Sequence, residues 1–598
     1  MDITPDNRTP TMQRTATPLI LCLILSACAP NGRAPIADAT GQAAPPPSAP
    51  KALAEPARTA DAINDQRAEH DAPILSAPAV AAAPRERAME SMAMKGEAKL
   101  MRVMPHPMPS IAPPQPVDRE RYQDITTNPV HQVATAPVST FSIDVDTGSW
   151  SNLRRFLNEG RLPPSDAVRV EECINYFPYD DAPPTGNTPF AVHTELAQSP
   201  WNPERLLMRV ALKGQDMGKQ TLPPANLVFL VDVSGSMRSA NKLPLLKSSL
   251  KLLVQQLRPQ DRISLVTYAG ASGLALPATP GNEKATILAA IDALNAGGST
   301  AGASGIELAY QTAQAGFVQG GINRILLATD GDFNVGQTNF EQLKARVEQL
   351  RATGVQLTTL GFGTGNYNEQ LMEQMADAGN GAYAYIDTLM EGHKVLVNEM
   401  SSTLATIAKD VKIQVEFNPA AVSEYRLIGY ENRMLRREDF NNDKIDAGEI
   451  GAGHSVTALY ELTPAGQRGL IDPLRYGSDP RPATATVARS AELAHVRLRY
   501  KQPHASTSQL IEHPVRRDAT RPLAATSDSF RFASAIAGFG QILRGGSYTG
   551  QWSIADARTL AAGALGNDQF GYRGEALRLM DLAAALSPQP PHATAPLE

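Results

Sequence analysis

The residues with the clearest capacity for chemistry lie in one short string, Asp232-Val-Ser234-Gly-Ser236, which directly follows a run of apolar residues. One carboxylate and two hydroxyls are hard oxygen donors, which suit Mg²⁺, Mn²⁺ or Ca²⁺ better than Zn²⁺. Gly235 allows the loop between the two serines to turn tightly. Alone, the string is a weak signal, because Asp, Ser and Gly also favour ordinary turns.

Two later positions offer oxygen donors of the same kind. Thr300 follows Gly298 and opens a predicted helix at about residue 302, and Asp330 ends the apolar run 325–329. In an open parallel sheet, ligands bind beyond the carboxyl ends of the strands. We therefore expect the donors to converge at one sheet edge and to form a divalent-metal site, whose residues are Asp232, Ser234, Ser236, Thr300 and Asp330.

In order and in spacing, these five residues resemble the metal ion-dependent adhesion site of von Willebrand factor type A domains. The resemblance implies that Ser234, Ser236 and Thr300 ligate the metal directly, whereas Asp232 and Asp330 act mostly through water. It also implies an open coordination position that takes a carboxylate from a protein partner. The expected cofactor is Mg²⁺, with Mn²⁺ or Ca²⁺ as alternatives, and the expected partner is a protein that offers an Asp or Glu side chain.

The segments around these residues alternate between apolar strands and amphipathic helices. Residues 227–231 suit a buried parallel strand, and Leu243, Leu246 and Leu250 recur on one face of the helix that follows. Further strand–helix units lead to a last helix predicted at about 388–404. Repeated units of this kind predict an α/β fold with a doubly wound, mainly parallel sheet.

The rest of the chain divides by composition and periodicity. We expect β-rich modules on both sides of the α/β domain, because short stretches there alternate with period two, and a helical segment near the carboxyl end. The predicted parts are a signal peptide (1–27), a disordered Ala/Pro-rich tether (28–118), an N-terminal β-rich domain (119–221), the type A-like domain (222–405), a C-terminal β-rich and helical domain (406–587) and a disordered tail (588–598).

The flanking regions carry a further resemblance. Residues 139–180 are similar to the segment that precedes the type A domain in a family of bacterial type A-domain lipoproteins, and residues 439–462 are similar to part of that family's C-terminal domain. The resemblance thus covers about 120–590. It implies an architecture more than a biological role.

The amino terminus has the features of an export signal. A short apolar run ends in Leu25-Ser26-Ala27-Cys28, which resembles the lipobox of bacterial lipoproteins, where the Cys becomes the acylated first residue. Acyl chains on Cys28 would anchor the chain to a membrane. We expect a lipid-anchored protein of the bacterial cell envelope, in the outer membrane by resemblance to the sorting rule for the residue after the Cys. The alternative is an ordinary signal with a chance Cys.

Bulk properties exclude other classes of partner. The formal net charge of the 598 residues is −6, so no strong positive field favours nucleic acid. The Gly-rich string 297–305 lacks the Lys-[Ser/Thr] pair of a phosphate-binding loop, which argues against a nucleotide.

We therefore interpret the sequence as an adhesion-like, metal-dependent protein-binding module and not as an enzyme. Two alternatives stay open. One is an envelope hydrolase that uses the metal as a Lewis acid with Asp332 as its general base. The other is a structural assembly factor in which the metal only stabilises the fold.

Overall fold

The computed structural model describes residues 120–299, 302–331, 336–472 and 491–587, all within one compact unit, Met108–Glu598. The predicted signal peptide, tether and tail lie outside the described residues, as do Cys28, Thr300 and Asp332. Of the helices described, none combines the length and the apolar character needed to cross a membrane.

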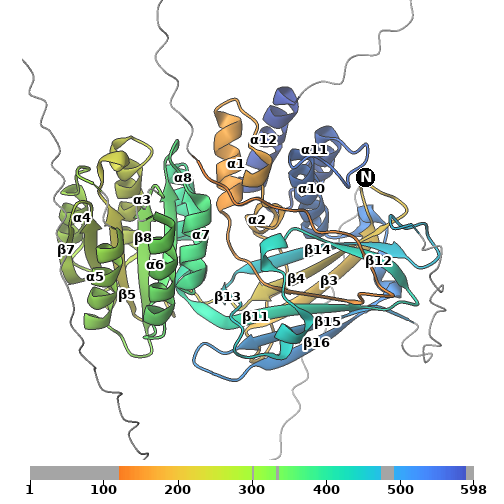
Figure 1. The fold of residues 1–598 in the computed structure, drawn as a ribbon, viewed down its shortest axis with the longest axis horizontal. Helices are drawn as coiled ribbons and strands as arrows, with labels where there is room; N and C mark the ends of the chain where they lie inside the picture. The colour runs from red at the N-terminus through yellow and green to blue at the C-terminus, as the bar shows by residue number, and fades with distance from the viewer. Residues whose placement is uncertain (1–119, 300–301, 332–335, 473–490, 588–598) are drawn as a thin grey trace, which may run out of the picture. The chain divides into compact units, whose positions relative to one another are not determined.

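An α/β domain occupies the middle of the chain and confirms the predicted fold class (Figure 1). Its six-stranded sheet has the order β10-β9-β8-β5-β6-β7, and each pair is parallel except β6 with β7. The edge strand β7 was not predicted from the sequence, because most of its residues are exposed and its apolar residues do not alternate regularly with polar ones. The strands are β5 (Ala225–Asp232), β6 (Arg262–Tyr268), β7 (Ser272–Pro280), β8 (Ile322–Thr329), β9 (Gln356–Phe362) and β10 (Tyr383–Ile386).

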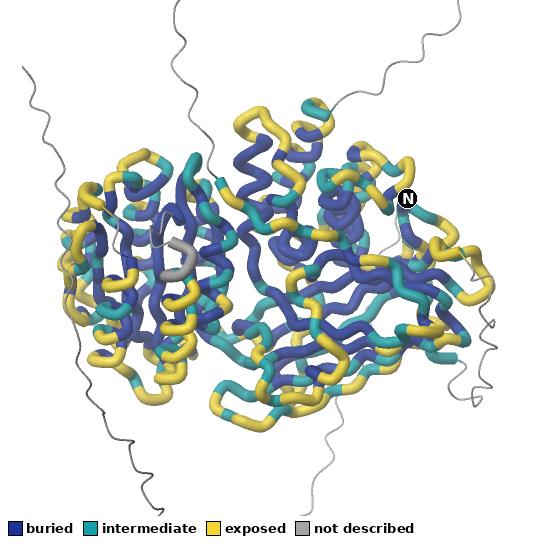
Figure 2. The backbone as a smooth tube through the Cα atoms, in the orientation of Figure 1, coloured by how far each residue is buried: buried dark blue, intermediate teal, exposed yellow. Residues whose placement is uncertain are grey.

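Helices cover both faces of this sheet, because successive side chains of its buried strands point to opposite sides. Phe229 of β5 shares a core with Leu246 and Val395, whereas its neighbour Leu230 shares the other core with Ile306. Figure 2 shows the central strands as buried. One face carries α3 (Leu243–Gln256), α4 (Lys284–Asp292), α8 (Leu389–His393) and α9 (Met400–Leu404), and the other α5 (Gly302–Ala315), α6 (Gly336–Arg351) and α7 (Glu369–Ala378).

The last helix, predicted as one element at 388–404, is broken in the structure. A π-helical segment, Lys394–Asn398, separates α8 from α9. The buried ammonium of Lys394 lies 4.2 Å from the ring centroid of Tyr176 and 3.0 Å from Glu399 Oε2. Contacts of this kind with a distant part of the chain leave no trace in local periodicity, so the sequence predicted an unbroken helix.

The regions on either side of the α/β domain form two β-sheets that share one hydrophobic core. The first sheet has the order β1-β12-β14-β4-β3-β17, and the second β13-β11-β15-β16, with β2 also paired to β11. The strands are β1 (His131–Gln132), β2 (Val138–Ser142), β3 (Phe190–Gln198), β4 (Leu206–Gly214), β11 (Thr406–Phe417), β12 (Val422–Ile428), β13 (Gly448–Gly451), β14 (Ser455–Pro464), β15 (Glu492–Lys501), β16 (Gln509–Arg516) and β17 (Thr520–Arg521).

Strand pairing joins the two regions that were predicted to be separate domains, 119–221 and 406–587. β4 pairs with β14 and β2 with β11, across about two hundred residues or more of intervening chain. A helical layer mixes them in the same way, since Trp150 of α1 packs against Phe539 of α10. We call the combined unit the flanking module. Its helices are α1 (Gly148–Asn158), α2 (Val170–Asn175), α10 (Asp528–Leu543), α11 (Ile554–Ala562) and α12 (Tyr572–Leu586).

Buried ion pairs connect the flanking module to the α/β domain. Arg154 of α1 bonds Asp387 and Glu391, which stand at the end of β10 and in α8, and the distance to Glu391 Oε2 is 2.8 Å. Arg169 bonds Glu373 of α7 at 2.8 Å. Removing one partner of such a pair destabilises the fold, because the charge of the other partner remains buried without compensation. Ion pairs as well as packing therefore hold the flanking module against the α/β domain.

This contact holds more carboxylates than guanidinium groups. Burial raises the pKa of Glu369 to about 8, although Arg169 opposes the shift, and burial raises the pKa of Glu171 to about 7. Both side chains thus retain a proton under conditions in which an exposed glutamate would be ionised.

We expect the free energy of unfolding to fall as pH rises from about 5 to about 8. The folded state holds a proton on Glu369 that the unfolded chain releases near pH 4.3, so one proton contributes a slope of up to about −1.4 kcal/mol per pH unit. Urea unfolding of the full chain at pH 6 and pH 8.5 measures the loss. Glu369→Gln should lose less stability over this window than the wild type.

The exposed Glu348 on α6 provides the matched control. Glu348→Gln should retain the wild-type dependence on pH. The same loss in Glu369→Gln as in the wild type would contradict a proton held on Glu369.

Candidate metal site

Asp232 stands at the carboxyl end of β5 and is fully buried. Its Oδ1 accepts a hydrogen bond from the backbone N–H of Ser234 at 2.8 Å, and its Oδ2 accepts from the hydroxyls of Thr329 at 2.9 Å and Tyr268 at 3.3 Å. Burial raises the pKa of Asp232, and the hydrogen bonds from Ser234 and Thr329 oppose the shift. Because donors from three neighbouring strand ends engage both oxygens, Asp232 shapes the loop and faces a bound cation only in part.

The two serines form a pair of oxygen donors beside Asp232. Their Oγ atoms lie 3.0 Å apart. Adjacent ligands of an octahedral Mg²⁺, each about 2.1 Å from the ion, are also about 3.0 Å apart. The backbone N–H of Gly235 donates to the carbonyl of Gly298 at 3.0 Å, which ties the serine loop to the loop that leads to residue 300.

Asp330 follows β8, the parallel neighbour of β5, and is fully buried. Its Oδ2 accepts from the ammonium of Lys242 at 2.9 Å and from the amide of Asn366 at 3.1 Å. Burial favours the neutral acid, but the charge of Lys242 and the hydrogen bonds from Lys242, Ser236 and Asn366 together outweigh it and hold the pKa of Asp330 below its ordinary value. Asp330 is therefore an ionised carboxylate next to the serine pair.

The structure thus gathers four of the five predicted residues at one edge of the sheet, namely Asp232, Ser234, Ser236 and Asp330. Thr300 lies outside the described residues. Sequence reasoning missed Lys242 and Asn366. Lys242 precedes the helix after the serine loop, where a lysine is too common to signal a site, and Asn366 follows β9 in a loop with no pattern to distinguish it.

The donor set fits a hard divalent cation. Two hydroxyls at octahedral spacing and an ionised carboxylate are oxygen donors, and the described part of the site offers no thiolate or imidazole that would favour Zn²⁺. Ser236 is partly exposed and Gly235 is exposed, so the outer side of the serine pair faces solvent.

A second group of carboxylates is a structural cluster. Asp144, Glu172 and Glu373 place ligand atoms within 4.8 Å of one another. The positive charges of Arg169 and Arg433 already occupy this cluster, at 2.8 Å from Glu373 and 3.3 Å from Asp144 respectively. Guanidinium groups thus do in this cluster what a metal would otherwise do.

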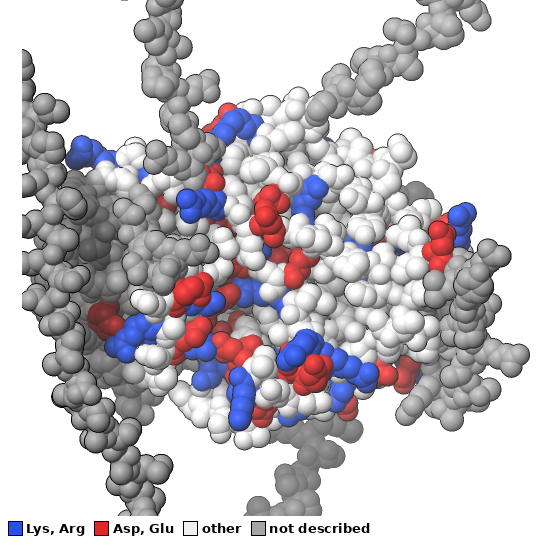
Figure 3. All heavy atoms as spheres, in the orientation of Figure 1, with Lys and Arg blue, Asp and Glu red and all other residues white. Residues whose placement is uncertain are grey.

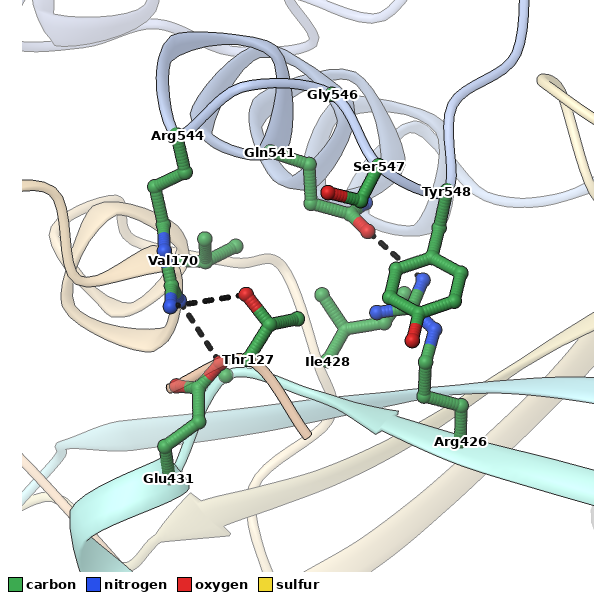
Figure 4. A pocket seen from close by; sticks show the side chains of 11 residues that line it. Thr127, Val170, Arg426, Ile428, Glu431, Gln541, Arg544, Gly546, Ser547 and Tyr548 are labelled. Carbon is green, nitrogen blue, oxygen red and sulfur yellow. Dashed lines mark hydrogen bonds and ion pairs between the residues drawn. The ribbon is translucent and has the colours of Figure 1, made fainter. Parts of the chain in front are cut away.

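A cavity in the flanking module is likewise structural. In Figure 4, Arg426 and Arg544 stand on opposite sides of it, with the apolar side chains of Val170 and Ile428 between them. Arg544 bonds Glu431 at 2.8 Å, and the guanidinium of Arg426 bonds Gln541 and lies under a tyrosine ring. The space open to water is about 20 Å³, enough for roughly one water molecule.

Charged side chains of both signs are intermixed on the face shown in Figure 3, with no broad field of one sign over the flanking module. This distribution agrees with the small net charge of the chain. It gives no support to a nucleic-acid partner on this face.

Three family models match the chain. The von Willebrand factor type A domain matches residues 226–399, a model described as von Willebrand factor matches 116–209, and the C-terminal region of the uncharacterized protein YfbK matches 402–586. The chain therefore carries a von Willebrand factor type A domain, as the five-residue motif implied. Attachment of lipid at Cys28 stays a prediction.

Curated relatives match different shares of the chain. The uncharacterized protein YfbK of Escherichia coli is 53% identical over 470 residues, which cover 77% of this chain and 81% of that protein. The uncharacterized protein sll0103 of Synechocystis is 31% identical over 49% of this chain and 72% of its own length. Inter-alpha-trypsin inhibitor heavy chain H3 of Pongo abelii is 25% identical over 41% of this chain and 30% of its own length.

Solved structures are more distant. The von Willebrand factor type A protein from Catenulispora acidiphila is 15% identical, with a TM-score of 0.37 over 67% of this chain and 92% of that chain. The ArnB paralog VWA2 from Sulfolobus acidocaldarius is also 15% identical, with a TM-score of 0.32 over 67% and 98%.

We expect one Mg²⁺ or Mn²⁺ to bind per chain, because four of the predicted residues lie together at one edge of the sheet and the two serine hydroxyls are 3.0 Å apart. Calorimetry on the full chain should show this site, and Asp232→Ala should abolish it. The double substitution Ser234→Ala/Ser236→Ala removes two oxygen donors and changes no charged residue. It should weaken the binding of the metal at least about tenfold.

The exposed Asp292 of α4 offers a control, and Asp292→Ala should bind as the wild type does. Equal binding by the wild type and the double serine variant would sink the assignment.

Proposed function

This chain belongs to the bacterial family of the Escherichia coli protein YfbK, and from that premise we propose that it binds a protein partner through a divalent metal held by its type A domain. The observation that carries the proposal is the serine pair, 3.0 Å apart and beside the ionised carboxylate of Asp330. Few of the direct ligands carry charge, so a bound Mg²⁺ would stay electrophilic. An Asp or Glu of the partner is the matching ligand, since hard cations prefer carboxylate oxygens.

The position of the serine pair supports recognition at the surface. Gly235 is exposed and Ser236 is partly exposed, so the outer coordination positions open to solvent and not into the core. The carboxylates behind them are fully buried and already hydrogen-bonded. A fixed, buried rear wall and an open front are what a docking site for a partner's side chain needs.

Turnover is a weaker alternative. Its proposed general base, Asp332, lies outside the described residues, and the groups bonded to Asp232 and Asp330 are hydroxyls, amides and an ammonium. A carboxylate bonded to an ammonium is a poor proton acceptor, because the positive charge of Lys242 lowers the pKa of Asp330. The geometry therefore favours binding over hydrolysis.

We further propose that acylated Cys28 anchors the chain in the bacterial cell envelope, most simply in the outer membrane. The string that ends in Cys28 supports this, together with the long Ala/Pro-rich stretch, 28–118, that would separate an anchor from the folded unit.

The partner proposal predicts capture that depends on the metal. Immobilised full-length protein, incubated with envelope extract, should retain a partner in Mg²⁺ and release it into EDTA, because the metal bridges the two proteins. A column that carries the double variant Ser234→Ala/Ser236→Ala should not retain that partner. Capture of the same proteins in EDTA, or by the variant, would refute a metal bridge and favour the assembly-factor alternative.

The anchor proposal predicts a change in fractionation. Cys28→Ser should yield an uncleaved precursor or a released product, because the acceptor thiol is lost, whereas the neighbouring substitution Ala29→Ser should leave acylation intact. Unchanged processing together with unchanged membrane association in Cys28→Ser would rule out lipidation.

A further inference from the structure

We propose that Lys242 sets the charge of the metal site, so that the loaded site attracts an anionic ligand at the expense of affinity for the metal itself. This inference rests on the proposed function. It identifies the residue that makes a carboxylate, and not a neutral group, the preferred ligand from the partner.

Lys242 is held in place from several sides. It immediately precedes α3, its side chain is only 8% exposed, and its ammonium donates to Asp330 Oδ2 at 2.9 Å and to Asn366 Oδ1 at 2.7 Å. Its aliphatic stem runs over Gly363, where an added Cβ would lie 2.3 Å from the Lys242 Cγ and Cε atoms. The left-handed conformation of Gly363, with φ of +81°, and this close approach both require glycine. The ammonium is therefore a fixed charge and not a mobile surface group.

The same carboxylate links Lys242 to the metal side of the site. Asp330 bonds Lys242 and Asn366 through Oδ2, and it also shares a hydrogen bond with Ser236, one of the serine pair. An ion bound at the serine pair would thus lie across one carboxylate from the ammonium. Two positive charges on opposite sides of one buried carboxylate would repel each other, and solvent would screen this repulsion only weakly.

The charges explain why an anion would complete the site. Among the described side chains bonded together there, Asp232 and Asp330 are acidic and Lys242 is basic, so these three groups carry one net negative charge when both carboxyls are ionised. A divalent cation converts this to one net positive charge, and a carboxylate from a partner restores neutrality. With a neutral residue in place of Lys242, the loaded site would already be neutral, and a carboxylate would bring an unbalanced negative charge into low dielectric surroundings.

The inference therefore predicts two opposite effects from one substitution. Lys242→Met keeps the length of the stem and removes the charge. It should tighten the binding of Mn²⁺ by about tenfold and weaken the binding of a carboxylate to the Mn²⁺-loaded protein by a similar factor, on the order expected for one fixed charge a few ångströms away.

Both constants can be measured on the full chain. The electron paramagnetic resonance signal of free Mn²⁺ gives the metal affinity, and the relaxation of acetate methyl protons by protein-bound Mn²⁺ gives the affinity for a carboxylate probe. Lys251, which lies on the same helix with 40% of its side chain exposed, supplies the control, and Lys251→Met should leave both constants unchanged. Lys242→Gln, which still donates a hydrogen bond but lacks charge, should shift both constants in the same directions as Lys242→Met.

The outcomes separate this inference from the proposed function. If the wild type binds no Mn²⁺, the metal site and this inference fail together. If the wild type binds Mn²⁺ but the neutral variants leave both constants unchanged, or weaken the metal and the carboxylate alike, the metal site stands and the role of Lys242 is overturned. Should Lys242→Met fail to fold, Lys242→Gln decides the question.

Discussion

The structure depends on how two buried carboxylates are neutralised at the carboxyl edge of a parallel sheet. Asp232 and Asp330 end adjacent strands and have no exposed surface, so each needs partners supplied by the protein. Asp232 is satisfied by three hydrogen-bond donors, and Asp330 by the ammonium of Lys242 and an amide. The order of the strands matters because it brings Thr329 and Tyr268 to either side of Asp232. A site built in this way is rigid at the rear and open at the front.

The flanking module contacts the same end of the α/β domain. Gly331, which follows Asp330, packs closely against Asn368, and Asn368 caps α7 by accepting from the backbone of Leu371. One turn further along α7, Glu373 bonds Arg169 of the flanking module. The backbone of Arg121 bonds Glu369 at the start of the same helix. The helix α7 thus contacts the loop after Asp330 at one end and the flanking module through a buried ion pair on its side, so it connects the candidate site to that module.

The sequence predicted the parts of this arrangement that follow from local pattern. The apolar run that ends at Asp232, the alternation of strands and helices and the order of the donors were enough to place four site residues together. It could not predict pairings such as Arg154 with Glu391, since polar partners 237 residues apart leave no periodicity. The pairing of β4 with β14 was hidden for the same reason, because each strand alternates properly whichever strand lies beside it. Lys242 was overlooked because a lysine near the start of a helix is commonplace, and only the fold shows that its ammonium meets Asp330.

The proposed function requires a hard cation to bind at the serine pair. Crystals of the full chain can be soaked with Mn²⁺, and anomalous scattering can then be measured at the manganese edge. We expect one strong peak about 2.1–2.2 Å from the Oγ atoms of both Ser234 and Ser236, on the side of Asp330. A peak among Asp144, Glu172 and Glu373 instead, or no peak at the serine pair under saturating Mn²⁺, would contradict it.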